Sequence, residues 1–320
     1  MGNNVLETTK FVVDNSKHVR INKNKIKDFC KNFNYHSIKN WMEYSPFNIE
    51  SLSDNKKLHF LLIFNAISFS YWSNPKWSVE YNGKIFDRGS WSLVVALGRA
   101  IDEEIPILNP NYLSNISDKD LRHILRGNTT IPLFEERLKI LREIGIVLVK
   151  RFDGDFSNLV KLAKKDAIKL VKLIVSNFSN FNDISEYGGK KIFFYKRAQA
   201  LVEGIYSLFK GKGFGNLKNI SKLTACADYK IPQILRKLGI LVYDNELSGK
   251  IDNQIEIPKG NELEIEIRAN TIWAVEYIKK ELRVLSKNIN SIHINDYLWL
   301  NAGSSSIKEK PHHLTRTIFY

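Results

Sequence analysis

Residues 163–178 read AKKDAIKLVKLIVSNF. Apolar side chains recur in this stretch every three or four residues, at Ala163, Ala167, Leu170, Val171, Ile174 and Phe178. This spacing gathers them on one face of a helix, where they can pack against a core. The same periodicity recurs along most of the chain, so the sequence predicts a mainly helical fold.

Helix start signals occur outside this stretch as well. Asn22 and Ser117 are favourable N-cap residues, and Asp120, three residues after Ser117, completes a pattern that resembles a capping box. Pro132 can open a helix because proline fits the first helical turn. We therefore expect helices after Asn22, after Ser117, from Pro132, and over residues 231–238.

Two segments favour β-strands instead. Residues 77–81 alternate in polarity, Asn82 and Gly83 suit a two-residue turn, and residues 84–86 return as a second strand. Residues 262–268 alternate between apolar and charged side chains, which predicts a half-buried strand. The predicted fold class is thus mainly α with a small β-sheet or hairpin.

The length of the chain allows a large buried core. We expect its 320 residues to form a single domain over residues 1–320, built as one unit or as two closely packed helical lobes whose boundary the sequence does not define. Residues 183–189 and 303–310 carry turn-forming side chains, and we expect these stretches to be the most flexible.

The charge balance is strongly basic. The chain has 48 Lys and Arg residues against 34 Asp and Glu residues, a formal net charge of +14 at pH 7. Such a charge is typical of proteins that bind nucleic acids or small phosphate esters. However, the lysines are spread along a chain rich in Lys, Asn and Ile, so a solvated basic surface is the favoured interpretation. We predict no stable nucleic-acid complex.

Cysteine, histidine and hydropathy exclude several classes of protein. Cys30 and Cys226 are the only cysteines, too few for a disulfide framework or a thiolate zinc site, and the seven histidines form no metal-binding motif. We therefore expect no metal or cofactor, and a reducing cytoplasmic location. The longest apolar run, residues 58–72, is too short to span a bilayer. We predict a monomer that does not contact a membrane.

The candidate chemistry lies in two short segments. Residues 194–199 read FYKRAQ, with Lys196 and Arg197 at the head of an apolar helix, and residues 227–233 read ADYKIPQ, with Asp228 just before a helix start. Small and apolar neighbours surround Asp228 in the sequence, so its carboxylate should have either a raised pKa or a fixed partner. One carboxylate facing two cations can act on a phosphorylated sugar, and a purely structural ion pair is the alternative.

Five segments in this order resemble the queuosine salvage family. No single one is specific, but their order is, and the resemblance runs from about Val19 to the last residue. The segments are Phe69–Trp72, Phe193–Gln199, Leu223–Gln233, Asp296–Trp299 and His312–Tyr320. Members of this family are N-glycosylases that release queuine from queuosine 5′-monophosphate, with a fold similar to that of the helix-hairpin-helix DNA glycosylases. The resemblance implies that fold, that reaction and that small-molecule substrate.

The resemblance also assigns roles to individual residues. Asp228, in the Ala-Asp-Tyr motif, would be the catalytic anion that stabilises or attacks the anomeric carbon. Lys196 and Arg197 would bind the 5′-phosphate. Trp72 and Phe69 could stack on the base. For both residues the alternative is an ordinary place in the hydrophobic core, and for Phe69 the core is the favoured interpretation. Further substrate contacts are assigned to Cys226, Tyr229, Asn295 or Asp296, His312, Arg316 and Tyr320.

Three positions depart from the family pattern and leave the base preference open. Cys226 stands where Phe is common, Ser68 where Asn is common, and the recognition acid falls on Asn295 or Asp296 according to register. Two alternatives therefore remain. A nucleic-acid glycosylase or binding module of helix-hairpin-helix kind would lose duplex affinity steeply with salt. A non-catalytic queuine-binding protein would hold the base without turnover.

Overall fold

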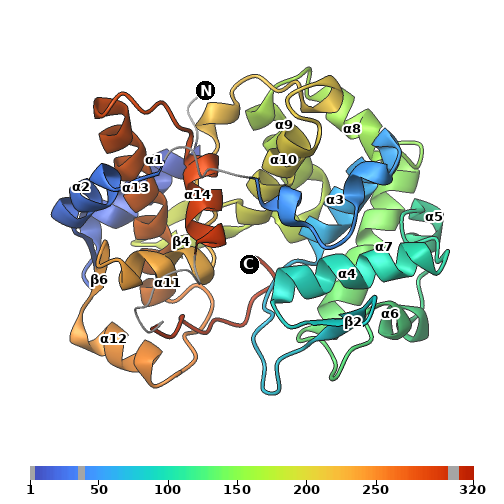
Figure 1. Cartoon of the computed structure of the whole chain (residues 1–320), viewed down its shortest axis with the longest axis horizontal. Helices are drawn as coiled ribbons and strands as arrows, with labels where there is room; N and C mark the ends of the chain where they lie inside the picture. The colour runs from blue at the N-terminus through green and yellow to red at the C-terminus, as the bar shows by residue number, and fades with distance from the viewer. Residues whose placement is uncertain (1–3, 35–39, 302–309) are drawn as a thin grey trace.

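The computed structural model describes residues 4–34, 40–301 and 310–320 and is mainly helical, as predicted (Figure 1). The helices are α1 (Asn4–Asn15), α2 (Lys23–Lys31), α3 (Asp54–Ala66), α4 (Gly89–Asp102), α5 (Pro110–Ser114), α6 (Asp118–Ile124), α7 (Phe134–Arg151), α8 (Phe156–Leu162), α9 (Ala167–Asn177), α10 (Lys196–Leu208), α11 (Lys230–Lys237), α12 (Asn245–Asp252), α13 (Glu262–Val284) and α14 (Ser291–Leu300). Short 3₁₀ helices are η2 (Trp41–Tyr44), η3 (Ile49–Ser51), η4 (Ser179–Phe181), η5 (Gly213–Gly215) and η6 (Ile220–Lys222).

The strands are short and pair as antiparallel ribbons. They are β1 (Val19–Ile21), β2 (Val79–Tyr81), β3 (Lys84–Phe86), β4 (Ile184–Tyr187), β5 (Lys190–Phe193) and β6 (Leu241–Tyr243). Strand β1 pairs with β6, β2 with β3, and β4 with β5. The β2–β3 hairpin confirms the predicted turn, because Tyr81 faces Lys84 and both Asn82 and Gly83 have positive φ, at 52° and 73°.

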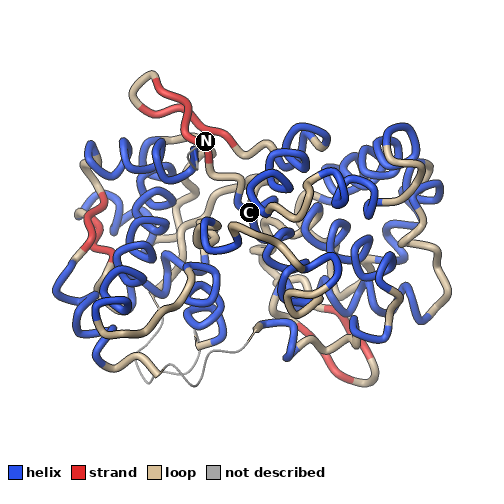
Figure 2. The backbone as a smooth tube through the Cα atoms, turned by 90° about the horizontal axis from the view of Figure 1, so that it is seen from above, coloured by secondary structure: helices blue, strands red, loops and turns tan. Residues whose placement is uncertain are grey.

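The helices form two groups, seen from two directions in Figures 1 and 2. Helices α3 to α10 make one group, and α1, α2 and α11 to α14 make the other (Figure 1). The last described segment, which ends at Tyr320, runs between them (Figure 1). That the chain is one domain, and that its fold is similar to helix-hairpin-helix glycosylases, stay predictions.

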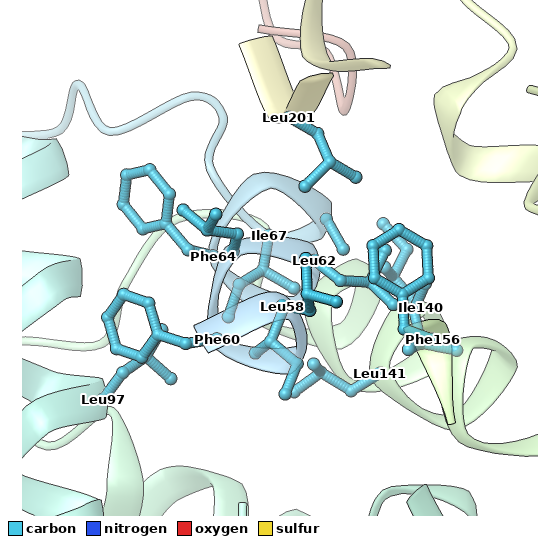
Figure 3. Close-up of a cluster of buried hydrophobic side chains, with 14 of the residues drawn as sticks. Leu58, Phe60, Leu62, Phe64, Ile67, Leu97, Ile140, Leu141, Phe156 and Leu201 are labelled. Atoms are coloured by element: carbon cyan, nitrogen blue, oxygen red, sulfur yellow. The ribbon is translucent and has the colours of Figure 1, made fainter. Parts of the chain in front are cut away.

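Helix α3 is the centre of the first group. Every residue from Leu58 to Ala66 is buried, so the helix has no solvent-facing side over this stretch. Figure 3 shows why: Phe60 points towards Leu97, Phe64 extends from the same side of the helix, and Leu62 lies on the side of Ile140. A helix that is apolar all round must be surrounded by other elements.

Helix α13 is the centre of the second group and corrects one prediction. Residues 262–268 were predicted as a strand, but they form the start of this helix, after the N-cap Asn261. The prediction was wrong because α13 is surrounded by α1, α2, α11 and α14, so its polar residues are buried with the apolar ones. Glu266, for example, accepts hydrogen bonds from the backbone of Lys17, His18 and Val19. In a helix buried on all sides, apolar residues need not recur every 3.6 residues along the sequence, so the helical pattern is lost.

The other local predictions were largely right. Asn22 caps α2, Ser117 caps α6, and α11 covers almost all of residues 231–238. The helix expected from Pro132 begins two residues later, at Phe134. Residues 163–178 form a helix only over α9. Ala163, at the start of this stretch, is the C-cap residue of α8, and Lys164 and Lys165, which both have positive φ, separate it from α9.

The two stretches expected to be flexible have different outcomes. Residues 184–187 form strand β4, and Asp183 before them is buried at 1% exposure. Residues 302–309, nearly all of the second stretch, lie outside the described residues.

Candidate active site

A pocket of about 870 Å³ lies where the two groups of helices meet. Its walls come from the segment before β2, the start of α4, the first residues of α10 and α11, and the end of α14. Six residues that the sequence predicted for the site line it: Trp72, Lys196, Asp228, Tyr229, His312 and Tyr320. We call it the Asp228 pocket.

Asp228 is held by the start of helix α11. Its Oδ1 accepts hydrogen bonds from the backbone N–H groups of Lys230, at 2.8 Å, and Ile231, at 3.0 Å. Its Oδ2 lies 3.7 Å from Nζ of Lys196, and the Asp228 and Lys196 side chains are 15% and 13% exposed. The carboxylate therefore has the fixed partners that the sequence suggested, with Oδ2 directed to the lysine and the pocket.

A buried ion pair fixes the backbone on both sides of this contact. Arg268 donates from Nη1 to Oδ1 of Asp183 at 3.0 Å, and from Nε to the carbonyl oxygen of Ala227 at 3.0 Å. The other oxygen of Asp183 accepts from the backbone N–H of Lys196 at 3.2 Å. Arg268 and Asp183 are 1% exposed. One ion pair thus positions the residue before Asp228 and the backbone of Lys196.

Helix α13 also anchors the last segment of the chain. Glu264 accepts a hydrogen bond from the Tyr320 hydroxyl at 2.9 Å, and the Tyr320 ring lies 4.5 Å from the Arg268 guanidinium. Burial by itself would lower the pKa of Arg268, but the charges of Asp183 and Glu264 raise it above its usual value. The guanidinium therefore stays charged beneath the pocket. Ser70 donates its backbone N–H to the Tyr320 carbonyl at 2.8 Å, which ties the segment leading to Trp72 to the same point.

Comparison with known proteins agrees with these features. The family model described as queuosine salvage protein matches residues 49–320. A protein of Sphaerobacter thermophilus named queuosine 5′-phosphate N-glycosylase/hydrolase is 36% identical, over 99% of this chain and 97% of its own. A Bos taurus protein of the same name is 37% identical, over 98% of both chains. The chain belongs to the queuosine salvage family.

Arg197, which the sequence analysis predicted to bind the 5′-phosphate, faces the protein interior instead. It is 2% exposed and donates to the carbonyl oxygens of Asn65, Ala66 and Asn180. Burial lowers its pKa to about 9. Its guanidinium bonds the last residues of α3, whose carbonyls have no partner within the helix. This differs from the predicted role, and Lys196 alone of the pair reaches the Asp228 pocket.

Phe69 and Arg316 also lie outside the wall of the pocket. Phe69 is fully buried, with the guanidinium carbons of Arg137 and Arg197 at 4.1 Å and 5.1 Å from its ring centroid. It has no face available for a base in this structure. Arg316 covers the Trp72 ring at 4.4 Å and lies 3.6 Å from Glu256. Arg316 therefore contacts Trp72, one of several aromatic residues that line the pocket.

The residues Cys226 and Asn295 brace the loop before Asp228. The Cys226 backbone N–H donates to Oδ1 of Asn295 at 3.0 Å. Burial raises the pKa of the Cys226 thiol to about 12. Asn295 therefore connects α14 to this loop, while its neighbour Asp296 points elsewhere.

Asp296 forms a buried acid pair with Glu203, a residue that the sequence analysis missed. Asn40 Nδ2 donates to Oε1 of Glu203 at 3.2 Å and to Oδ2 of Asp296 at 3.5 Å. Burial raises the pKa of both carboxyls, and the charge of Glu203 raises that of Asp296 further. The sequence does contain a sign of this residue. Glu203 is a charged residue within the otherwise apolar segment from Leu201 to Ile205, which could have marked it as a candidate for a buried functional group.

Three cations that the sequence analysis also missed line the Asp228 pocket. They are Lys76, Arg88 and Lys230. His312 packs on Tyr229, with ring centroids 4.6 Å apart, and its Nδ1 donates to the His313 carbonyl at 2.8 Å. Burial lowers the pKa of His312, and the charges of Lys230 and Lys76 add to this effect while Asp228 opposes it. Lys76, Lys230 and Asp228 are therefore all close enough to His312 for their charges to act on it.

The described ranges contain neither a membrane-spanning helix nor a cluster of metal-binding side chains. No helix there is long and apolar enough to cross a membrane. In the same residues, no group of three or more His, Cys, Asp or Glu side chains lies close enough together to hold a metal ion.

Replacing Arg268 tests the buried ion pair. Arg268→Met leaves Asp183 buried without its cation, so we expect the free energy of unfolding to fall by about 3–5 kcal/mol in chemical denaturation. Arg122→Met is the matched control, because Arg122 pairs with Asp118 on the surface, and it should change stability little. Equal losses in the two variants would contradict a special role for Arg268.

The acid pair predicts a pH dependence of stability. The ordinary pKa values are 4.5 for Glu203 and 3.8 for Asp296, and both are raised in the folded protein. The folded state thus keeps a proton that the unfolded chain has lost, so stability falls as pH rises above these values. Glu203→Gln removes one titrating group. The free energy of unfolding of this variant, relative to that of the wild type, should therefore increase between about pH 5 and pH 8. A constant difference across that range, as expected for the exposed control Glu135→Gln, would refute the coupling.

Proposed function

We propose that this chain hydrolyses the N-glycosidic bond of queuosine 5′-phosphate and releases queuine. The observation that carries the proposal is the position of Asp228, with one carboxylate oxygen fixed by two backbone N–H groups and the other at 3.7 Å from Lys196 in the wall of a pocket of about 870 Å³. The names of the relatives from Sphaerobacter thermophilus and Bos taurus give the substrate.

The reaction needs an anion near the sugar. As the bond between the base and the anomeric carbon breaks, its electron pair leaves with the base and positive charge develops on the ribose. Asp228 Oδ2 stabilises that charge. Water supplies the hydroxyl oxygen of the new C–O bond, and the proton that this water loses balances the proton taken up by the departing base. Queuine is a 7-deazapurine and cannot be protonated at N7, so its departure depends on hydrogen-bond donors at its other edges, each contributing about 3 kcal/mol when well placed.

Lys76 and Lys230 are the cations best placed for the 5′-phosphate. Both line the pocket, and both act on His312 together with Asp228. Lys196 is engaged with Asp228, and Arg197 with backbone carbonyls. The N-terminus of α11, which begins at Lys230, adds the positive end of a helix dipole. A phosphate held there orients the ribose over Asp228.

The base is recognised by aromatic rings and by the acid pair. Trp72, Trp91 and Trp299 line the pocket. Trp41 lies behind them, with its ring centroid 5.6 Å from that of Trp91, and it is close enough to Glu203 and Asp296 to lower the pKa of both carboxyls against the effect of burial. The side chain of queuine carries a secondary amine that is cationic at neutral pH. A buried carboxyl pair that shares a proton can exchange it for such a cation.

Asp228→Asn is the direct test of the catalytic role. The amide oxygen can still accept from Lys230 and Ile231, so the fold is kept while the negative charge is lost. We expect the release of queuine, measured by chromatography, to fall about 10²–10⁴-fold. Asp244→Asn is the matched control, because Asp244 caps α12 in the same way but lies outside the pocket. Binding of queuine with no turnover above background in wild type and variant alike would favour the non-catalytic alternative.

Lys76→Ala tests the phosphate site. We expect KM for queuosine 5′-phosphate to rise about 10- to 100-fold, as for the loss of a charged hydrogen bond, with little change for the unphosphorylated nucleoside. Lys84→Ala, on the neighbouring hairpin, is the control and should behave as wild type. Equal release from the nucleoside, its 5′-phosphate and guanosine monophosphate would rule out this phosphate anchor.

Glu203→Gln tests recognition of the amine. We expect a higher KM for queuosine 5′-phosphate but an unchanged KM for 7-deazaguanosine 5′-phosphate, which lacks the amine. The Asp296→Asn variant should show the same split, because the two carboxyls act together. If KM rises to the same degree for both substrates, the two carboxyls support the structure and do not recognise the amine of the base.

A further inference from the structure

A second pocket, of about 710 Å³, lies between α7, α9 and the start of α10. Among the described residues it shares no lining side chain with the Asp228 pocket. We call it the α7–α9 pocket. Its volume is within the range of sites that hold small molecules.

One wall of the α7–α9 pocket is apolar. Ile168, Val171 and Val175 line it from α9, and Val147 lines it from α7. The α9 residues are spaced by three and four positions, so they share one face of that helix. Apart from Val171, these side chains are only partly buried, so they offer apolar surface to a molecule that binds in the pocket.

The charges at this pocket are positive. Arg151 and Lys172 both line it. Glu143 is the one acidic residue among its described lining residues, and both of its oxygens already accept hydrogen bonds, from the Ser179 backbone at 2.7 Å and from Asn180 Nδ2 at 3.2 Å. An apolar wall beside two cations suits a small molecule with an apolar body and one anionic group.

The α7–α9 pocket reaches the residues that hold the Asp228 pocket together. Tyr195 lines it, and the next residue, Lys196, lines the Asp228 pocket. Tyr195 has a φ of 50°, an unfavourable conformation for a residue other than glycine. Gln199 also lines the α7–α9 pocket, and its side-chain oxygen accepts from the backbone N–H of Thr224 at 2.9 Å, on the chain leading to Asp228.

We propose that the α7–α9 pocket binds a small amphipathic anion and that its occupancy is transmitted through Tyr195 and Gln199 to Lys196 and the loop before Asp228. This is a binding site separate from the one that holds the substrate. A bound molecule restrains these two side chains, which in turn restrain the backbone of residues 194–199 and 223–230.

Binding is tested with 8-anilinonaphthalene-1-sulfonate, an aromatic body with one sulfonate, followed by its fluorescence. We expect one saturable site in the wild type and in Asp228→Asn. Lys172→Glu should weaken binding at least about tenfold, since it removes a charged contact. Val175→Trp should abolish binding by filling the pocket. Lys169→Glu is the matched control, because Lys169 is exposed on the same helix and does not line the pocket.

Transmission is tested by hydrogen exchange, which needs no catalytic activity. With saturating probe, the amides of residues 194–199 and 223–230 should exchange more slowly in the wild type. Exchange should be unchanged in Val175→Trp, and a measured melting temperature close to that of the wild type is the check that this variant folds. The proposal is overturned by the absence of saturable binding, by equal affinity of Lys172→Glu and Lys169→Glu, by displacement of the probe with queuosine 5′-phosphate, or by unchanged exchange in the wild type.

Discussion

The buried ion pair of Arg268 and Asp183 is the interaction on which the arrangement of the site depends. A guanidinium offers five N–H donors in one plane, and here they reach the Ala227 carbonyl and both Asp183 oxygens together. Because burying two charges costs desolvation, such a pair adds little net stability of its own. The ion pair instead sets the geometry of the site, since it fixes the backbone before Asp228 and at Lys196 relative to helix α13.

Two further buried arginines act in the same way on the other side of the pocket. Arg197 donates to the last carbonyls of α3, and Arg137 donates to the Ile67 and Phe69 carbonyls just beyond it. Burial lowers the pKa of Arg137 to about 10 and of Arg197 to about 9, so both stay charged at neutral pH. They hold the segment that leads to Trp72. Both sides of the pocket are thus fixed by cations that bond to backbone oxygens and do not touch solvent.

Much of the local structure could be predicted because its signals act over a few residues. The Asn22 and Ser117 caps and the Asn82-Gly83 turn each depend on hydrogen bonds or φ values within one turn of the chain. The start of α13 could not be predicted in this way. Its buried Glu264 and Glu266 are satisfied by Tyr320 and by residues 17–19, which are distant in sequence. A half-buried strand and a fully surrounded helix then give the same alternating pattern.

For this protein, the sequence alone determined the helical class, most local caps and turns, and the order of motifs that indicates the queuosine salvage family. The tertiary structure decided which side chains meet. Lys196 and Arg197 are neighbours, yet successive helical residues point about 100° apart, so one reaches the pocket and the other the core. The pairing of Arg268 with Asp183, 85 residues apart, and of Glu203 with Asp296 depends on how whole helices pack. No local hydrogen-bonding rule carries that information, because it arises only when distant segments bury their surfaces against each other.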